Sequence, residues 1–593
     1  MDKHICWLDA EQKDLEEKVL AEYSSDEVWQ HLQYLTTLTR RAGTDDELKA
    51  ANYISQKLEE YGIEREIHEL DAYVSLPEDA ELKIFHPVQK LLPCLPAAFT
   101  APTPPEGIEA DLISLMKHRG EDHKNTDVRG KVVLIGGNKE SRSEAEYIVS
   151  KGRAAAHIYV TPGKSKTISM VNLRKTWGSP TPQTIDEDPR TPAISICNED
   201  GRYLLELMKN SRVVVNVKAR AWRGYKKIRL PTGTLRGTKD VQKFVLVAGH
   251  YCSWFTGATD NAAADSLLLE MGRIFSKYRK RLSRGIRFAW WSGHEQGTFA
   301  GSTWYVDNFW DDLRDDAIAY LSMDSIGRTG SVGFETRNTE EVRKFHETVV
   351  GNVLSLEVKS ERITKRGDQS FHGMGLPSFT GKPDLIVEDS GDMFVEPAWY
   401  RHSIEDTLDK LDVDLIRIPF EVNTVSILRL CNNPVLPFEF VTMADVLKDA
   451  LNDLRKDNKS AIDLTSLVAQ VKILKKRAES LNKRINRNLS VYESKQKDKV
   501  LETKFDEINA CLMELSRILI PILSTGAGKY SQDPWGTPFK PIPILQPLKQ
   551  LNAMASGSDE YRALRTLLVR HRNEVSDALD SANRLLGTVL SKV

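Results

Sequence analysis

Three long apolar runs constrain the fold of this chain more than any other feature. They span Phe244–His250, Ile286–Gly293 and Ala317–Asp324, and helical patterns follow the first two at Asn261–Lys277 and Ser302–Phe309. Continuous apolar strands that alternate with helices are typical of a largely parallel sheet covered by helices on both faces. We therefore predict an α/β fold built on a mixed, mostly parallel sheet.

The residue pattern changes twice before this core. Apolar residues recur every three or four positions across Asp45–Gly62, which predicts a helix that ends at the glycine. A strand over Ile63–Ala72 and a Pro-rich crossing segment at 80–105 are expected next. Short β-branched runs then predict a small α/β unit, with strands at 130–137, 154–160, 191–196 and 213–221 and helices at 143–151 and 201–208.

The chain is predicted to be helical from about Thr442 onward. Apolar residues between Leu464 and Ile485 step alternately by three and four, which is a heptad seam, and a similar series runs from Leu501 to Leu519. After a Pro/Gly-rich break, Tyr561–Val589 forms another amphipathic pattern. Either two or three antiparallel helices of one chain pack together, or the seam pairs with a second copy. We favour the second reading, which predicts a homodimer.

Composition excludes several function classes. The 593 residues include 82 Lys+Arg and 84 Asp+Glu, so the net charge of −2 gives no basis for nucleic-acid binding. The N-terminus lacks a secretory signal pattern, and no run reaches the ~18 apolar residues of a membrane helix. The six cysteines lie far apart without a Cys-x-x-Cys pair, as in a reducing compartment. We expect a cytoplasmic protein that binds neither nucleic acid nor membranes.

Polar residues of metal-binding type follow the predicted strands. They are His250, Asp260, His294, Glu295, Asp324 and, after a short strand near 377–380, His402. Because functional residues of an α/β sheet gather at the carboxyl ends of its strands, we expect these side chains to meet at one edge. Setting His294 aside, two imidazoles and three carboxylates suit zinc and suffice for two ions that share one bridging carboxylate.

Five motifs here resemble the family of co-catalytic zinc aminopeptidases and glutamate carboxypeptidases. In order, they are GHYCSWFTGATDNAAADSLLLEMGRIF, WWSGHEQGTFAGS, YLSMDSIG, GDQSFHGMGLPSF and WYRHSIEDTLDKL. The resemblance, which covers about residues 45–422, implies a zinc-exopeptidase-like domain over 1–105 and 226–440. It also implies a protease-associated-like insertion over 106–225 and a helical, dimerisation-like domain over 441–593, similar to that of the transferrin-receptor-like branch.

The same resemblance implies a role for each candidate ligand. His250 and Asp324 would hold one zinc ion, Glu295 and His402 the other, and Asp260 would bridge the two. Metal-bound water would then attack an amide carbonyl of a peptide or small amide substrate.

Two positions depart from the family pattern. Where the family has an Asp that hydrogen-bonds the zinc-binding imidazole, this chain has Cys252. A thiol lacks that charge, so the first site should be weaker, unless Cys252 binds the metal as a thiolate or merely fills space. Where the family has its general base, a Glu, this chain has His294. Imidazole also accepts protons, but His294 could instead bind metal or a substrate carbonyl.

These departures leave three functions open. The first is a metal-dependent hydrolase of the aminopeptidase or carboxypeptidase type, with His294 as substitute base. The second is a non-catalytic homodimeric binding or scaffold protein on the same fold, and the third is a hydrolase of non-peptide amides. Trp254 and Trp399, in loops beside the candidate ligands, are candidates to line a substrate pocket.

Overall fold

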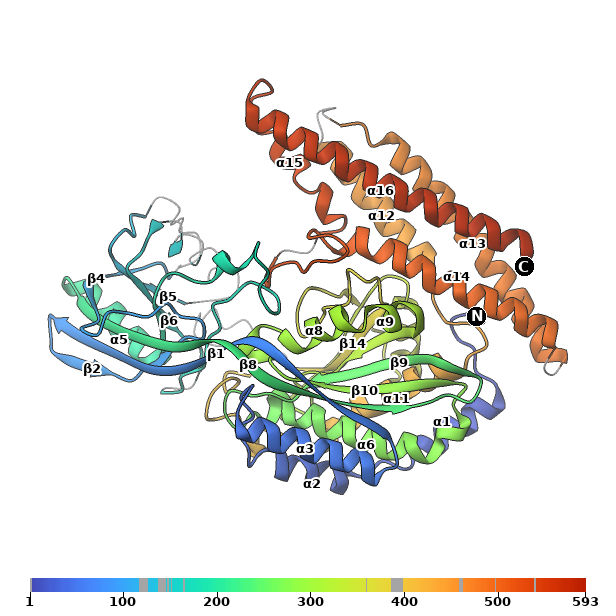
Figure 1. Cartoon of the computed structure of the whole chain (residues 1–593), viewed down its shortest axis with the longest axis horizontal. Coiled ribbons are helices and arrows are strands. Elements are labelled where there is room, and N and C mark those ends of the chain that lie inside the picture. Colours follow the sequence, from blue (N-terminus) through green and yellow to red (C-terminus); the bar gives the residue numbers. More distant parts are fainter. Residues whose placement is uncertain are drawn as a thin grey trace.

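The computed structural model describes residues 3–116, 126–136, 146, 149–150, 152–163, 166–358, 360–385, 398–457, 462–495, 498–537 and 540–593. Figure 1 shows a central sheet with helices on both sides, a small unit beside it and a group of long helices above it. The predicted helix at 143–151 lies mostly outside the described residues.

The central sheet is mostly parallel, as predicted. Its strands run in the order β13-β12-β14-β11-β9-β10-β8, and β14, β11, β9 and β10 pair in parallel. Their bounds are β9 (Asp240–His250), β10 (Arg284–Trp291), β11 (Ala317–Ser322), β12 (Val332–Asn338), β13 (Glu361–Arg362) and β14 (Ser378–Asp384). The predicted α/β fold class is therefore confirmed.

Both faces of this sheet are buried under helices. Val245 and Val247 of β9 belong to one core cluster, whereas Phe244, Leu246 and Ala248 belong to another on the opposite face. The first face is covered by α1 (Ala10–Leu20), α2 (Ser25–Leu35), α3 (Asp45–Glu60), α6 (Ala263–Tyr278), α10 (Arg343–Leu354) and α11 (Val413–Asn432). The second face is covered by α8 (Ala300–Asn308) and α9 (Trp310–Asp316). Burial on both faces explains why these strands are apolar throughout.

A long antiparallel ribbon joins the central sheet to the small unit. It consists of β1 (Glu64–His86) and β8 (Val214–Leu235), which pair along their whole lengths. The predicted crossing segment at 80–105 is therefore wrong for its first residues, which continue β1. Pro77 is tolerated inside the strand because the pairing register shifts there. The strand β8 also passes without a break through residue 225, where we placed a domain boundary.

The strands of the small unit continue the sheet beyond β8, because β4 (Ile108–Ser114) pairs antiparallel with β8. Strands β4, β5 (Val132–Ile135), β6 (Ala156–Val160) and β7 (Ala193–Ile196) pair in parallel, and α5 (Asn198–Asn210) follows them. Two short strands lie at its edges, β2 (Lys90–Leu92) against β1 and β3 (Leu95–Pro96) against β7. Its assignment as a protease-associated domain stays a prediction.

The C-terminal helices are α12 (Phe440–Asp457), α13 (Thr465–Lys495), α14 (Lys499–Ser524), α15 (Leu548–Leu551) and α16 (Asp559–Lys592). Hydrogen bonds join Gln470 to Ser576, Arg477 to Asn583 and Arg484 to Leu590, always 106 residues apart. Helices α13 and α16 therefore run parallel in heptad steps, whereas the consecutive helices α12 and α13 pack antiparallel, as predicted, with Lys475 bonded to Asp445 and Asn482 to Glu439.

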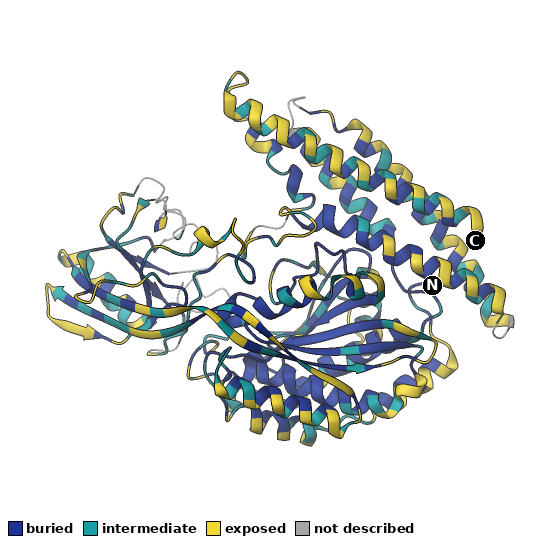
Figure 2. Cartoon of the chain, viewed as in Figure 1, coloured by how far each residue is buried: buried dark blue, intermediate teal, exposed yellow. Residues whose placement is uncertain are grey.

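The heptad seam of α13 is buried inside the single chain. Leu467, Leu474, Leu481 and Ile485 are at most 1% exposed, and Figure 2 shows the buried side of these helices turned inward. The interpretation that this seam pairs with a second copy is therefore wrong. Dimer formation through another face stays a prediction.

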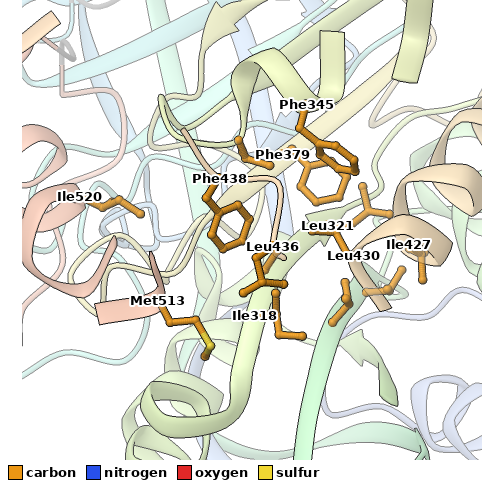
Figure 3. Close-up of a cluster of buried hydrophobic side chains, with 14 of the residues drawn as sticks. Ile318, Leu321, Phe345, Phe379, Ile427, Leu430, Leu436, Phe438, Met513 and Ile520 are labelled. Atoms are coloured by element: carbon orange, nitrogen blue, oxygen red, sulfur yellow. The ribbon is translucent and has the colours of Figure 1, made fainter. Parts of the chain in front are cut away.

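Helix α14 docks the helical region onto the central sheet. Figure 3 shows Met513 and Ile520 of α14 around Leu436 and Phe438, which pack against Ile318 of β11. The buried guanidinium of Arg517 also donates hydrogen bonds to four backbone carbonyls, those of Leu313, Arg314, Ala317 and Gly375. The two regions thus share one continuous core. In the described part of the chain, no helix has both the length and the apolar character needed to cross a membrane.

Candidate metal centre at the carboxyl edge of the sheet

The carboxyl ends of neighbouring strands bring the predicted ligands together. His250 is the last residue of β9, Asp324 follows β11 by two residues, and Glu295 lies in the short helix α7 (His294–Gly297) after β10. Asp260 lies in the helical turn Ala258–Ala262 before α6, and His402 lies in the loop between β14 and α11. All five predicted ligands meet at one edge of the sheet.

Asp260 occupies the centre of this cluster. Its Oδ1 lies 3.1 Å from Nε2 of His250, and its Oδ2 lies 3.1 Å from Nε2 of His402. His250 is also 3.8 Å from Asp324, and His402 is 3.2 Å from Glu295. The two carboxylate oxygens of Asp260 therefore face two different sets of ligands, as a bridging carboxylate does.

The donor atoms fit divalent cations. In the described part of the chain, three overlapping groups of potential ligands have their donor atoms within 4.8 Å of one another. The groups are His250, Asp260 and Asp324; Asp260, Glu295 and His402; and His250, His294 and Glu295. His250 Nε2, Asp260 Oδ2 and Glu295 Oε1 are buried, and none of their close polar contacts has the geometry of a hydrogen bond. Because buried polar atoms without a partner are costly, their convergence indicates a site built for cations.

Mutual ion pairing shifts the titration of the ligands. Burial alone would lower the pKa of His402, but the charge of Glu295 and the close approach of the Asp260 carboxylate at 3.1 Å raise it to about 9. Burial would raise the pKa of Asp260, yet Arg401 and both imidazoles hold it well below its usual range. Without a cation, the histidines therefore carry protons that a metal ion must displace.

Buried hydrogen bonds fix the loops that carry the ligands. The guanidinium of Arg40 is buried and donates to the carbonyls of Tyr251, Thr256 and Gly257, which shapes the loop between His250 and Asp260. His402 has a left-handed backbone (φ 60°), and its carbonyl accepts a hydrogen bond from Met170 N at 2.8 Å. Such strained positions persist only where the surrounding structure holds them.

Cys252 acts on His250 through its backbone. The Nδ1 of His250 lies 3.1 Å from the carbonyl oxygen of Cys252, so this carbonyl is the partner that orients the ring. The thiol is fully buried, and burial raises its pKa, which favours the neutral form. Cys252 belongs to none of the three ligand groups among the described residues.

The imidazole of His294 lies beside the metal centre, against the ring of His250. Its ring stacks on that of His250 with centroids 3.7 Å apart and planes inclined by 20°, and it makes a T-shaped contact with Phe299 at a centroid distance of 4.6 Å. Its Nδ1 lies 2.7 Å from Oδ2 of Asp368. The sequence interpretation missed this aspartate, although it lies in the quoted motif GDQSFHGMGLPSF, because nothing in the residue pattern pairs it with His294.

Three further residues lie near the site. Arg401, which we did not single out, lies 2.9 Å from Asp260, and its only signal in the sequence was its place beside His402. Trp254 is only 2% exposed and packs with Phe99 and Met170, so its predicted place in a pocket lining is wrong. Trp399 is half-buried and contacts Tyr400.

Residues 232–424 match peptidase family M28. The chain contains an M28 peptidase domain. The matched range includes all five predicted ligands together with His294 and Asp368, which confirms the resemblance to the zinc aminopeptidases and glutamate carboxypeptidases; the transferrin-receptor-like branch stays a prediction. The M28 domain places this chain among the metallopeptidase-like hydrolases.

Individual relatives agree with this assignment. The chain is 25% identical over 515 residues to a probable glutamate carboxypeptidase of Zea mays, a match that covers 71% of this chain and 69% of the maize protein. Among solved structures, a peptidase M28 precursor from Shewanella amazonensis superposes with a TM-score of 0.56 at 17% identity, over 72% of this chain and 98% of that one. A zinc aminopeptidase from Bacillus subtilis gives 0.54 at 18% identity, over 69% and 96%. Both neighbours share the fold of the M28 domain.

Proposed function

We propose that this chain is a zinc-dependent hydrolase that cleaves the amide bond of a peptide or a small amide. His250 and Asp324 would hold one ion, Glu295 and His402 the other, and Asp260 would bridge them. The position of Asp260 carries this proposal, because each of its oxygens lies 3.1 Å from a different imidazole. The M28 domain and the name of the Bacillus subtilis neighbour support zinc as the metal.

When bound, zinc would polarise the amide carbonyl and acidify a water molecule. The remaining tasks fall to side chains of this chain. Glu295 and Asp324 supply negative charge that balances the cations, and Asp260 is buried between them, whereas the side chains of Asp324 and His402 are partly exposed to solvent. His294 lies beside this centre and is the residue we assign to proton transfer.

The stacking geometry favours His294 as a base over His294 as a ligand. A ligating imidazole directs its nitrogen lone pair within the plane of its ring. Although His294 lies with His250 and Glu295 in one of the three groups, the rings of His250 and His294 lie face to face, 3.7 Å apart and inclined by only 20°, so their in-plane lone pairs are poorly directed toward one shared ion. Since His250 is placed as a ligand by Asp260 and Asp324, His294 remains available to accept a proton.

A metal count joined to a substrate panel tests this proposal. We expect purified protein to bind zinc and to hydrolyse some member of a panel of peptides and N-acyl amino acids. Asp260→Asn should lower the zinc content, whereas His294→Ala should keep the zinc and reduce kcat by about 10²–10⁴-fold. The matched control His346→Ala changes a buried histidine that lies outside the three ligand groups. Zinc-loaded protein that leaves every substrate intact would contradict the hydrolase proposal.

A scaffold function is the alternative, and the replacement of the family's glutamate base by His294 favours it. In that case metal would bind without turnover, and His294→Ala would change neither zinc content nor any activity. A non-peptide amide substrate would instead show as turnover restricted to the small amides of the panel.

We also propose that the chain forms a homodimer through a face of its C-terminal helices other than the buried α13 seam. Light scattering on the full-length protein should give twice the chain mass of 67.0 kDa. A single-chain mass at micromolar concentration would contradict this proposal.

A further inference from the structure

Asp368 is built to hold one particular orientation of His294. Its Oδ2 lies 2.7 Å from His294 Nδ1, and its Oδ1 accepts a hydrogen bond from Ser302 Oγ at 2.8 Å. The residue is 3% exposed and has a left-handed backbone with φ 59°. A non-glycine residue in this region is strained and persists only when its surroundings determine it. Asp368 belongs to none of the ligand groups among the described residues.

The hydrogen bond decides which ring nitrogen carries the proton. An ionised carboxylate only accepts hydrogen bonds, so Nδ1 of His294 must be the donor. In the neutral ring, Nε2 is then unprotonated, and it makes no hydrogen bond with the described residues. Because His250 stacks on one side of the ring and Phe299 closes another, the imidazole has little room to turn over.

Residues from distant parts of the chain hold Asp368 in place. Ser302 also lies 2.9 Å from Ser370 Oγ, which accepts a hydrogen bond from the indole of Trp177 at 2.8 Å. The carbonyl of Ser370 accepts a further bond from Gln532 at 3.0 Å. The loop that carries Asp368 is thus tied to α8, to the block between β6 and β7, and to the segment after α14.

We propose that Asp368 is a positioning residue that keeps His294 in the Nδ1-protonated form, so that Nε2 is the base of the proposed hydrolysis. This inference rests on the proposed function. As the water oxygen bonds to the carbonyl carbon, one water proton moves to Nε2, and Asp368 stabilises the imidazolium that forms. The same proton then passes to the leaving nitrogen as the carbon–nitrogen bond breaks, which restores neutral His294.

The tautomer of His294 can be determined by NMR without any substrate. In long-range ¹H–¹⁵N spectra of zinc-loaded protein labelled with ¹⁵N-histidine, the signal that His294→Gln removes should show a protonated Nδ1. Asp368→Asn should shift this signal to the Nε2-protonated form or to a mixture, whereas Asp315→Asn, an exposed control, should not. An Nε2-protonated ring in the unaltered protein, or an unchanged tautomer in Asp368→Asn, would overturn the inference.

Kinetics on a substrate from the panel provides the second readout. Asp368→Asn should reduce kcat by about 10²–10⁴-fold while KM and zinc content stay within about twofold. In a His294→Glu background the same change should have little effect, because a carboxylate base has no ring tautomer to select. An equal loss in both backgrounds would show a merely structural role. If the tautomer is as expected but no substrate is cleaved, the proposed function fails and the positioning role stands.

Discussion

Zinc affinity should rise steeply with pH, because the two histidines proposed as ligands, His250 and His402, must lose protons before they can bind the metal. Contacts with Glu295 and Asp260 raise the pKa of His402 to about 9, and contacts with Asp260 and Asp324 raise that of His250 well above its usual value. The carboxylates have lowered pKa values and stay ionised from pH 7 to 9. They therefore add nothing to the pH dependence in this range.

The size of the effect follows from His402 alone. With a pKa of about 9, only about one molecule in a hundred has a neutral His402 at pH 7, which costs about 2.7 kcal/mol of binding free energy. Because half of the molecules have a neutral His402 at pH 9, this residue alone should increase zinc affinity about 50-fold between pH 7 and 9, and release of a second proton from His250 should increase it further. The slope of log affinity against pH should lie between one and two.

Competition with a chelator of known pH dependence measures this affinity, and calorimetry in buffers of different ionisation enthalpy counts the protons released. The matched control is His157→Gln, since His157 is a buried histidine whose pKa is lowered to about 3 by burial alone. This variant should keep the profile of the unaltered protein. A change smaller than tenfold between pH 7 and 9, or fewer than one proton released at pH 7, would refute the reasoning.

Three further predictions concern stability and the metal. Without metal, the raised pKa of His402 contributes about 3 kcal/mol to the free energy of unfolding, which is fully present below about pH 6.5 and lost as pH rises through about 9. The Tm of the metal-free protein should therefore fall over this pH range, and bound zinc should remove this pH dependence of Tm. Phe438→Ala, at a fully buried position between α14 and the sheet, should cost about 3–5 kcal/mol in denaturant unfolding, whereas Leu567→Ala, at a 45% exposed position, should cost under about 0.5 kcal/mol. Cys252→Asp should tighten zinc binding about 10–100-fold by giving His250 a charged partner, while Cys252→Ser should change zinc affinity little. Loss of zinc in either variant would show instead that the thiol is a ligand.

The central sheet and the members of the candidate site that follow its strands were predictable because local sequence determines their positions. Strands buried on both faces are apolar throughout, and the polar residue that ends each strand lies at the sheet edge by construction. His250 and Asp324 could thus be placed together without knowing any other contact. The length of β1 was not predictable, because its polar and proline-containing half becomes a strand only by pairing with β8.

The packing of the C-terminal helices was also only partly predictable from the sequence. The heptad steps of α13 predicted a buried seam, but periodicity does not say which helix covers it. Its parallel partner α16 begins more than sixty residues after α13 ends, beyond α14, and depends on long-range contacts such as that of Arg477 with Asn583. The choice between a second copy and the same chain could therefore be made only in three dimensions.

The residues that hold the loops of the metal centre in place lie far from these loops in the sequence, so their contacts could not be predicted. Asn172, between β6 and β7, donates a hydrogen bond to the carbonyl of Glu295 at 2.9 Å, and Met170 bonds the carbonyl of His402. Residues 170–172 of the small unit therefore hold the backbone of both proposed ligands of one ion, Glu295 and His402. Trp177 of the same unit donates a hydrogen bond to Ser370, which lies two residues after Asp368. The small unit is thus part of the scaffold of the site, and the ligand geometry requires it to be folded against the M28 domain. Sequence motifs identify which residues have the chemistry, but the partners that orient them lie in segments that carry no such signature.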